Sequence, residues 1–326
     1  MQNLSDSKIK KVTILGGGSF STAIAVLLKH NCEKTFMWEY NQDIAKSMQE
    51  SRLNHHLNVR IPENVFVTSD LSLSIDDSEL IFIAVPSSAV EEVITKAKPY
   101  IKKNQQIIIC SKGLTSTQEF LSDCVHRILP ENNFFVLAGP ALAPEIVIPG
   151  DQTLTVMDLA GSIGCQELKE KIQSKNLFVN ITDDIKGVQL GSFKNVLTIF
   201  SGMLEGAKFP QNTQSAILIM GIRDILKIGD ALGVNPKTLL SFSFIGDLWL
   251  EGSRNHKIGY RFGAGEKMNE ILKGLDYVPE GIITLDNALK LAKKLNVEVP
   301  VIKNLNQIIY ENKDIRKACE EILERV

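Results

Sequence analysis

The sequence lacks any long hydrophobic run, which argues against a membrane-spanning helix. No apolar stretch approaches the roughly 20 residues that cross a bilayer. The N-terminal segment MQNLSDSKIKKVTILGGG places basic residues before an apolar run, but this run is short and ends in glycines. We therefore expect no secretory signal peptide and no integral membrane segment.

Cysteine is scarce and irregularly spaced. The cysteines form no Cys-x-x-Cys pair and their number is odd, which argues against a disulfide framework and a zinc knuckle. Such usage is typical of a reducing compartment, so we expect a cytoplasmic protein and predict no metal site. The five cysteines are Cys32, Cys110, Cys124, Cys165 and Cys319.

The chain also lacks a strong charge of either sign. A net charge of −2 over 326 residues gives no electrostatic reason to expect nucleic acid or an anionic membrane as a partner. Local basic clusters are still compatible with a small anionic substrate. The content of 44% apolar and 23% charged residues is typical of a packed globular protein, and the length suits two domains.

The first half of the chain alternates short β-rich runs with helical segments. The runs LIFIAVP, QQIIIC and FFVLAGP are continuously apolar, which predicts a parallel sheet covered by helices on both faces. We therefore predict an α/β domain over residues 1–184. The further strand candidates are KKVTILG, KTFMWEY, LTVMD and LFVNITD.

After about Asp184 the pattern becomes helical, which predicts an all-α second domain over residues 185–326. Asn212 is expected as an N-cap and Gly233 as the C′ residue of one of its helices. The segments predicted as helices are 185–206, 212–232, 236–245, 266–273, 281–296 and 300–324.

A glycine-rich turn follows the first strand. Gly16, Gly18 and Ser21 have GxGxx(G) spacing, and Glu39 stands 21 residues beyond Gly18 at the end of the second strand. Glycines let the backbone approach a pyrophosphate, and the following helix N-terminus stabilises its charge. The combination predicts a Rossmann-type dinucleotide site; the alternative is a tight turn without a ligand. An acid accepting from both ribose hydroxyls favours NAD, although the adjacent Tyr40 leaves NADP possible.

Polar residues occur where strands end and inside an apolar helix. Lys112 follows QQIIIC, at the strand end that lines the ligand crevice of doubly wound sheets, or it is an ordinary loop lysine. Gly139 after FFVLA either lets a ligand approach or forms a plain turn. Lys194 in GVQLGSFKNVLTIF either snorkels to water or is partly buried at a site, where a lowered pKa suits proton exchange. Asp247 after SFSFIG is a cap, a turn residue or the partner of that lysine.

Together these segments resemble the NAD(P)-dependent glycerol-3-phosphate dehydrogenases along nearly the whole chain. Nine segments resemble motifs of that family in the same order, and each is weak alone. They are GGGSFSTAIA, FMWEY, AVPSSAV, SKGL, AGPALAPEI, GVQLGSFKNV, GDLWL, SRNHKIG and VPEGIIT.

The resemblance implies a role for each matching residue. Lys194 matches the proton-transfer lysine, with Lys112 and Asp247 as further catalytic residues. The implied substrate contacts are Lys112, Gly139, Asp247, Ser253, Arg254 and Asn255. The implied nucleotide contacts, including the fingerprint, are Gly16, Gly18, Ser19, Phe20, Ser21, Glu39, Tyr40, Lys112, Ala143, Arg254, Val278 and Glu280.

The implied reaction interconverts glycerol 3-phosphate and dihydroxyacetone phosphate, with substrate and nicotinamide in a cleft between the domains. Arg254 and Asn255 are expected to hold the phosphate, because arginine offers paired donors to its oxygens. The family also implies a homodimer that supplies glycerol 3-phosphate for phospholipid synthesis. The alternatives are a paralogous dehydrogenase of another phosphorylated or carboxylated ketone, and a nucleotide-binding sensor.

Three positions depart from the family pattern. The segment before Ser253 is about four residues shorter, and Glu251-Gly252 replaces a Thr-Cys-Thr type sequence. Met220 stands where the family carries arginine, and Ala141 replaces a usual Ser or Thr. We expect the reaction class to survive these changes, with glycerol 3-phosphate or a close relative as the substrate.

Overall fold

The computed structural model describes residues 8–148, 150, 153–250, 253–275 and 277–326. The chain forms two compact units. The first comprises residues up to Thr115 together with Glu119–Gln189, and the second comprises Ser116–Gln118 and Leu190–Val326. The main boundary between the two units therefore lies after Gln189, a few residues beyond the boundary expected from the sequence.

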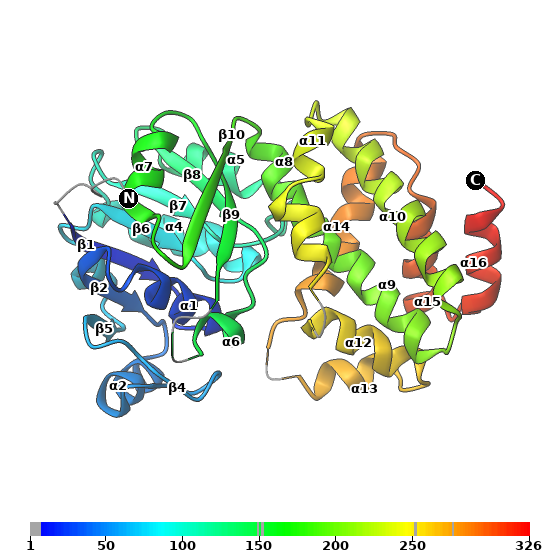
Figure 1. Ribbon diagram of the computed structural model, residues 1–326, viewed down its shortest axis with the longest axis horizontal. Coiled ribbons are helices and arrows are strands. Elements are labelled where there is room, and N and C mark those ends of the chain that lie inside the picture. Colours follow the sequence, from blue (N-terminus) through cyan, green and yellow to red (C-terminus); the bar gives the residue numbers. More distant parts are fainter. Residues whose placement is uncertain (1–7, 149, 151–152, 251–252, 276) are drawn as a thin grey trace. The chain divides into compact units, whose positions relative to one another are not determined.

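Unit 1 contains an eight-stranded sheet with the order β10-β9-β8-β7-β6-β1-β2-β5 (Figure 1). Its neighbouring strands are parallel except β8 and β9, which are antiparallel. The strand bounds are β1 (Ile9–Leu15), β2 (Cys32–Trp38), β5 (Val65–Thr68), β6 (Leu80–Ile83), β7 (Gln106–Ile109), β8 (Phe134–Ala138), β9 (Thr155–Gly161) and β10 (Leu177–Thr182).

The predicted α/β architecture is confirmed, with two local differences. In its described residues, the connection from β8 to β9 has one helix, the four-residue α6 (Ala143–Ile146), which is shorter than the crossover helix that parallel pairing usually needs. The sequence also missed β5 and the small hairpin of β3 (Leu53–Asn54) and β4 (Val59–Arg60), because these strands are very short.

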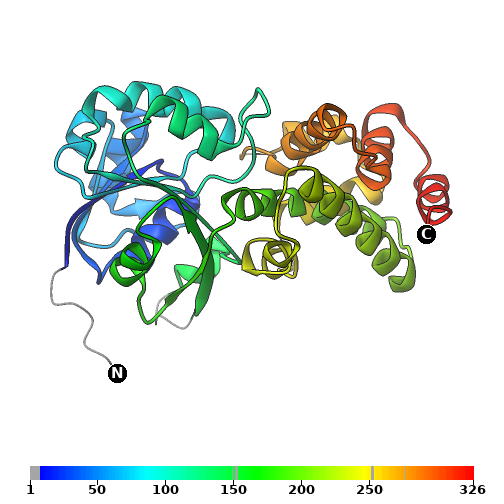
Figure 2. The same cartoon turned by 90° about the horizontal axis from the view of Figure 1, so that it is seen from above.

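Helices cover both faces of this sheet (Figure 2). Successive side chains of a strand point to opposite faces, which gives two separate core clusters. Ile14 and Phe82 belong to one core cluster, together with residues of α1 and α7, whereas Leu15 and Ile83 belong to the other, with residues of α4 and α5. The helix bounds are α1 (Ser19–Leu28), α2 (Gln42–Ser51), α3 (Leu71–Ile75), α4 (Val90–Ala97), α5 (Leu121–Ile128), α7 (Cys165–Ile172) and α8 (Ile185–Leu190).

Unit 2 is helical, as predicted. One π-helical turn, η4 (Phe242–Gly246), lies between its helices. None of the helices in the described part of the chain is long and apolar enough to cross a membrane. The helix bounds are α9 (Lys194–Gly206), α10 (Gln211–Ala231), α11 (Pro236–Leu239), α12 (Arg254–Gly263), α13 (Met268–Lys273), α14 (Glu280–Lys294), α15 (Pro300–Glu311) and α16 (Ile315–Leu323).

Several helix predictions need correction. The helix expected over 185–206 is divided by a 3-10 turn, η3 (Gly191–Phe193), and the one over 300–324 is divided at Asn312, which has a φ of 56°. The segment 236–245 holds α11 and the start of η4 rather than one helix. Asn212 lies inside α10, whose N-cap is Pro210.

Two other helix features are informative. Gly233 has a φ of +72° just after α10, so its prediction as the C′ residue is confirmed. Residues 254–263, which lie outside the segments predicted as helices, form α12. Its glycines, Gly259 and Gly263, allow close packing against α9.

Candidate functional site

The residues predicted to bind ligand divide between the two units. In unit 1 the glycine-rich turn joins β1 to α1. Gly16 has a φ of +125°, which favours glycine, and a Cβ there would lie 2.9 Å from the carbonyl oxygen of Ala84. Gly18 is the N-cap of α1, and among the described residues no heavy atom beyond its chain neighbours lies within 4 Å of its Cβ position. The space beside Gly18 can therefore admit a ligand.

The first residues of α1 complete this turn. Ser19 and Phe20 open the ten-residue helix, so their backbone N–H groups belong to its positive end. Ser21, at the third fingerprint position, is fully buried, and its Oγ lies 3.0 Å from the Cβ position of Gly16. This serine is therefore small enough to allow the strand and the helix to pack closely, which is the usual role of glycine at this position.

Glu39 directs its side chain toward the glycine-rich turn. A Cβ placed on Gly17 would lie 2.4 Å from Glu39 Oε2, and the backbone N–H of Asn41 donates to Glu39 Oε1 over 3.0 Å. Tyr40 points to solvent, with 77% of its surface exposed. Of the two neighbours, it is the carboxylate that lies beside the turn, as ribose recognition requires.

One residue of β3 supports this turn and has no distinguishing pattern in the sequence. Asn54 is fully buried and donates through Nδ2 to the carbonyl oxygen of Gly17 (3.1 Å) and to Thr22 Oγ1 (2.8 Å). These bonds brace the glycine-rich turn against the start of α1. No local pattern distinguishes this asparagine in the sequence, because its partners lie more than 30 residues away.

The remaining unit 1 residues follow the ends of β7 and β8. Lys112 comes three residues after β7, near Cys110, whose thiol pKa is raised by burial. Gly139 follows β8, and a Cβ there would lie 2.6 Å from the carbonyl oxygen of Val156 in β9. Strand packing therefore explains this glycine without a ligand. Ala143 is the first residue of α6 and is buried.

Unit 2 buries a lysine against an aspartate. Lys194 Nζ lies 3.2 Å from Asp247 Oδ1 and also donates to the main-chain oxygen of Asp247 over 3.1 Å. The two side chains are only 7% and 5% exposed. The structure thus places together two residues that lie 53 positions apart in the sequence. Burial makes each charge depend strongly on the other.

Gly191 allows these two residues to meet. A Cβ on Gly191 would lie 2.4 Å from the carbonyl oxygen of Ser243, so η3 and η4 pack backbone against backbone. Lys194 directly follows η3, and Asp247 directly follows η4. Without the side chain of a larger residue between them, the two turns hold the lysine and the aspartate at salt-bridge distance.

Four glycines bring α9 and α12 into close contact. Cβ atoms on Gly202 and Gly206 would lie 2.1 Å from the carbonyl oxygens of His256 and Tyr260, respectively. Cβ atoms on Gly259 and Gly263 would lie 1.9 Å and 2.0 Å from backbone oxygens of α9. Because the contacts advance along both helices in the same direction, the pair is parallel. The starts of α9, at Lys194, and of α12, at Arg254, therefore lie at the same end.

Ser253, Arg254 and Asn255 form the start of α12. Ser253 is the N-cap, and its Oγ accepts from the backbone N–H of His256 over 3.2 Å. Arg254 is exposed and lies over the ring of Tyr277, with Cζ 4.7 Å from the ring centroid. Asn255 is buried, and its Oδ1 accepts from the backbone N–H of Gly281 over 3.0 Å. Ser253 and Asn255 thus have structural bonds that the sequence did not reveal.

The two remaining predicted contacts lie next to this group. Val278 is 41% exposed, and Glu280 is the first residue of α14. Gly281 follows Glu280 and is held by Asn255, so the start of α14 is fastened to the start of α12. The nucleotide contacts expected in unit 2 therefore lie on the segment that Arg254 and Asn255 contact.

The positions that depart from the family pattern have ordinary packing roles where they are described. Met220 is buried in α10, and its sulfur accepts from Arg223 Nη1 over 3.5 Å. Ala141 packs against the core of unit 1. Glu251 and Gly252 lie outside the described residues.

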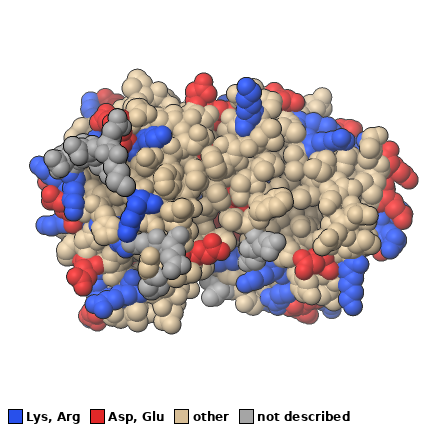
Figure 3. All heavy atoms as spheres, in the orientation of Figure 1, with Lys and Arg blue, Asp and Glu red and all other residues tan. Residues whose placement is uncertain are grey.

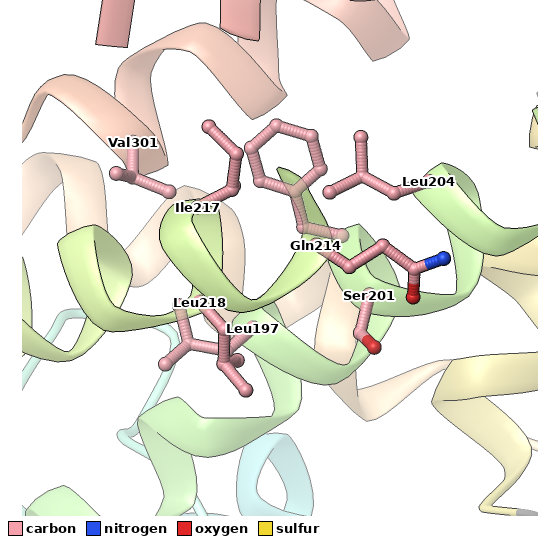
Figure 4. Close-up of a pocket in the computed structure, with 8 residues that line it drawn as sticks. Leu197, Ser201, Leu204, Gln214, Ile217, Leu218 and Val301 are labelled. Atoms are coloured by element: carbon pink, nitrogen blue, oxygen red, sulfur yellow. The ribbon is translucent and has the colours of Figure 1, made fainter. Parts of the chain in front are cut away.

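The small apolar cavity of unit 2 is not part of this site. It has a volume of about 10 Å³, enough for one water molecule at most, and lies between α9, α10 and α15 (Figure 4). Leu197, Ile217 and Val301 are among the residues that line it. Within the described ranges, no group of three or more His, Cys, Asp or Glu residues could hold a metal ion.

The charges on the surface are mixed. On the face drawn in Figure 3, basic and acidic side chains are interspersed over each unit. This view gives no electrostatic indication of a polyanionic partner.

Unit 1 is thus a doubly wound dinucleotide-binding unit, and unit 2 carries a buried lysine–aspartate pair beside a helix that starts with an arginine. Comparison with known proteins identifies the family. Residues 11–162 match the N-terminus, and residues 184–320 the C-terminus, of NAD-dependent glycerol-3-phosphate dehydrogenase. The chain belongs to this family.

Individual relatives agree along nearly the full length. The chain is 33% identical to a glycerol-3-phosphate dehydrogenase [NAD(P)+] of Bartonella tribocorum, with 96% of this chain and 97% of the relative covered. It is 31% identical to the corresponding protein of Citrifermentans bemidjiense, with 97% of each covered. The crystal structure of glycerol-3-phosphate dehydrogenase from Coxiella burnetii is similar with a TM-score of 0.90 and 30% identity, covering 97% of this chain and 99% of that one.

Proposed function

We propose that this protein interconverts sn-glycerol 3-phosphate and dihydroxyacetone phosphate with a nicotinamide dinucleotide. The observation that carries the proposal is the buried Lys194–Asp247 pair in a member of a dehydrogenase family. A nucleotide sensor needs no such pair, because it transfers no proton. The family and the two relatives named above act on this substrate by name.

In this proposal, Lys194 exchanges the proton at the C2 oxygen. When the ketone is reduced, negative charge develops on that oxygen, and the lysine ammonium donates a proton to it. When the alcohol is oxidised, the neutral amine accepts the same proton. The bound cofactor supplies or receives the hydride at C2. Asp247 holds the ammonium through a carboxylate and a main-chain oxygen, which fixes its position.

Arg254 is proposed to bind the phosphate. It opens α12, so a phosphate beside it also meets the positive end of a ten-residue helix. Because α9 and α12 are parallel, this end and the start of α9, where Lys194 lies, belong to the same end of the helix pair. A three-carbon phosphate can therefore be held at one end and protonated near the other by residues of unit 2.

Glu39 leads us to propose that NAD is preferred over NADP. Its carboxylate faces the glycine-rich turn and can accept hydrogen bonds from the ribose hydroxyls. A 2′-phosphate in the same place would be repelled. The open space beside Gly18, the turn at Gly16 and the start of α1 fit the pyrophosphate of either cofactor.

The same proposal includes a cytoplasmic homodimer that supplies glycerol 3-phosphate for phospholipid synthesis. It rests on the resemblance to the family and, for the compartment, on the sparse unpaired cysteines. Size-exclusion chromatography with light scattering tests the dimer, since a monomeric mass contradicts it.

Because Met220 occupies a position where the family pattern has arginine, a related substrate is the second candidate. A panel of phosphorylated and carboxylated ketones separates the two candidates. A kcat/KM for dihydroxyacetone phosphate at least tenfold above every other ketone supports the first.

The phosphate role is tested by comparing two ketones that differ only in the phosphate. Loss of charge-assisted hydrogen bonds typically costs about 1.5–3 kcal/mol, so Arg254→Ala should raise KM for dihydroxyacetone phosphate roughly 10- to 150-fold. Arg254→Lys should rescue only part, because an ammonium lacks the planar fork. Unphosphorylated dihydroxyacetone should be used poorly by both proteins. If Arg254→Ala impairs both ketones equally, the arginine only braces its helix.

A further inference from the structure

Tyr277 contacts the arginine that we expect to bind phosphate. Arg254 Cζ lies 4.7 Å from the centroid of the Tyr277 ring, a distance at which a cation is attracted to an aromatic face. Arg254 is exposed, whereas Tyr277 is half-buried. A guanidinium stacked through its face keeps its N–H groups at the edge of the stack, where they can still bind an anion.

The segment that carries Tyr277 is held by a second, independent contact. The Gly281 backbone N–H donates to buried Asn255 Oδ1 over 3.0 Å. A Cβ on Gly281 would lie 2.6 Å from that oxygen, so a larger residue would disturb the contact. Two consecutive residues, Arg254 and Asn255, therefore contact residues 277–281 at both ends. The ring is thus held in place against the arginine rather than on an unattached loop.

We propose that Tyr277 is a positioning residue that orients Arg254 for the phosphate of the substrate. This inference rests on the proposed function. An exposed arginine samples many rotamers, and binding must order it at an entropic cost. A ring that already holds the guanidinium removes part of this cost. Because the tyrosine ring is uncharged, it orients the guanidinium without neutralising its charge, as a carboxylate would.

The experiment measures KM and kcat for dihydroxyacetone phosphate in a set of variants. Cation–π contacts at exposed sites correspond to about a two- to fivefold change in binding, so Tyr277→Leu should raise KM by that factor. The value of kcat should stay at the wild-type level. Tyr277→Phe should behave like the wild type, because it retains the ring. Tyr310→Leu, at a tyrosine of α15 that is 54% exposed, is the matched control and should leave KM unchanged.

A double-variant comparison separates positioning from a general structural effect. In the Arg254→Ala background, Tyr277→Leu should have no further effect on KM. The proposal is overturned if Tyr277→Leu leaves KM unchanged, if Tyr277→Phe loses as much as Tyr277→Leu, or if the loss persists without the arginine.

A binding measurement keeps this proposal distinct from the proposed function. Inorganic phosphate should protect the wild type from thermal unfolding, and its apparent affinity should fall two- to fivefold in Tyr277→Leu. If the wild type does not reduce dihydroxyacetone phosphate, the proposed function fails, while this shift in phosphate affinity still tests Tyr277. Equal phosphate affinity in the two proteins overturns the positioning role.

Discussion

The Lys194–Asp247 pair allows a prediction about stability that does not depend on knowing the substrate. Both side chains are almost completely buried, and the ammonium has a carboxylate and a main-chain oxygen as acceptors. Removing one partner of a buried pair leaves an uncompensated charge, which typically costs about 3–5 kcal/mol. In Asp247→Asn the main-chain oxygen still accepts from Lys194, so we expect the lower end, about 3 kcal/mol, whereas Lys194→Met leaves the carboxylate without this donor and should cost about 3–5 kcal/mol.

The double variant tests whether these costs come from the pair itself. Lys194→Met/Asp247→Asn contains neither charge, so it should be more stable than the sum of the single changes predicts by about 2–3 kcal/mol. Urea unfolding followed by far-UV circular dichroism measures the free energy of unfolding. Fluorescence of buried Trp38 in a Trp249→Phe background reports on unit 1 separately, because the chain has one tryptophan in each unit.

An exposed pair in the same unit is the control. Lys290 and Asp286 pair at 2.6 Å on α14, with side chains 53% and 55% exposed. Asp286→Asn should change the free energy of unfolding by no more than about 0.5 kcal/mol. If Lys194→Met and Asp247→Asn also cost less than about 1 kcal/mol each and their effects add, the two residues do not form a buried ion pair and our account of the site is wrong.

Two further predictions concern the cofactor and pH. Glu39→Ser should narrow the preference of kcat/KM for NADH over NADPH, because it removes the charge that repels a 2′-phosphate; a wild type that prefers NADPH contradicts our interpretation of Glu39. Burial raises the pKa of Asp224 from 3.8 to about 6, despite its bonds to the backbone N–H groups of Val301 and Ile302. The folded state therefore binds the proton more tightly than the unfolded state. The resulting contribution to the free energy of unfolding is about 3 kcal/mol; it is fully present below about pH 4 and is lost as the pH rises to about 6. As the pH rises from about 4 to about 6, Asp224→Asn should therefore become more stable relative to the wild type in urea unfolding. If the difference in the free energy of unfolding between the two proteins stays constant over this range, the pKa of Asp224 is not raised.

The sequence predicted the fold where the pattern was local and repetitive. Short apolar and β-rich runs indicated the strands β1, β2 and β6 to β10, and the change in periodicity after Asp184 indicated the helical unit. Features determined by distant contacts were missed. The helix α12 contains two glycines, Gly259 and Gly263, which serve its contact with α9, and it was not among the segments predicted as helices.

The candidate site was predictable to a different extent in each unit. The glycine-rich turn and Glu39 follow a spacing that has a direct physical meaning. The contact of Lys194 with Asp247 could only be suggested from their unusual apolar surroundings, because it depends on Gly191 and on two turns that are not adjacent in the sequence. Asn54 and Tyr277 were missed, since their partners cannot be recognised without the fold.

The most direct test of the account is the steady-state oxidation of NADH with dihydroxyacetone phosphate as the only substrate, in the wild type and in Lys194→Ala. The wild type should turn over, and Lys194→Ala should lower kcat by a factor of roughly 10² or more, the scale of general acid–base assistance. NADH affinity, measured by fluorescence titration, should change little, because the lysine serves the substrate. A wild type that is inactive with this ketone, or a Lys194→Ala variant with near-normal kcat, would contradict the assignment of Lys194 as the proton-transfer group of a glycerol-3-phosphate dehydrogenase.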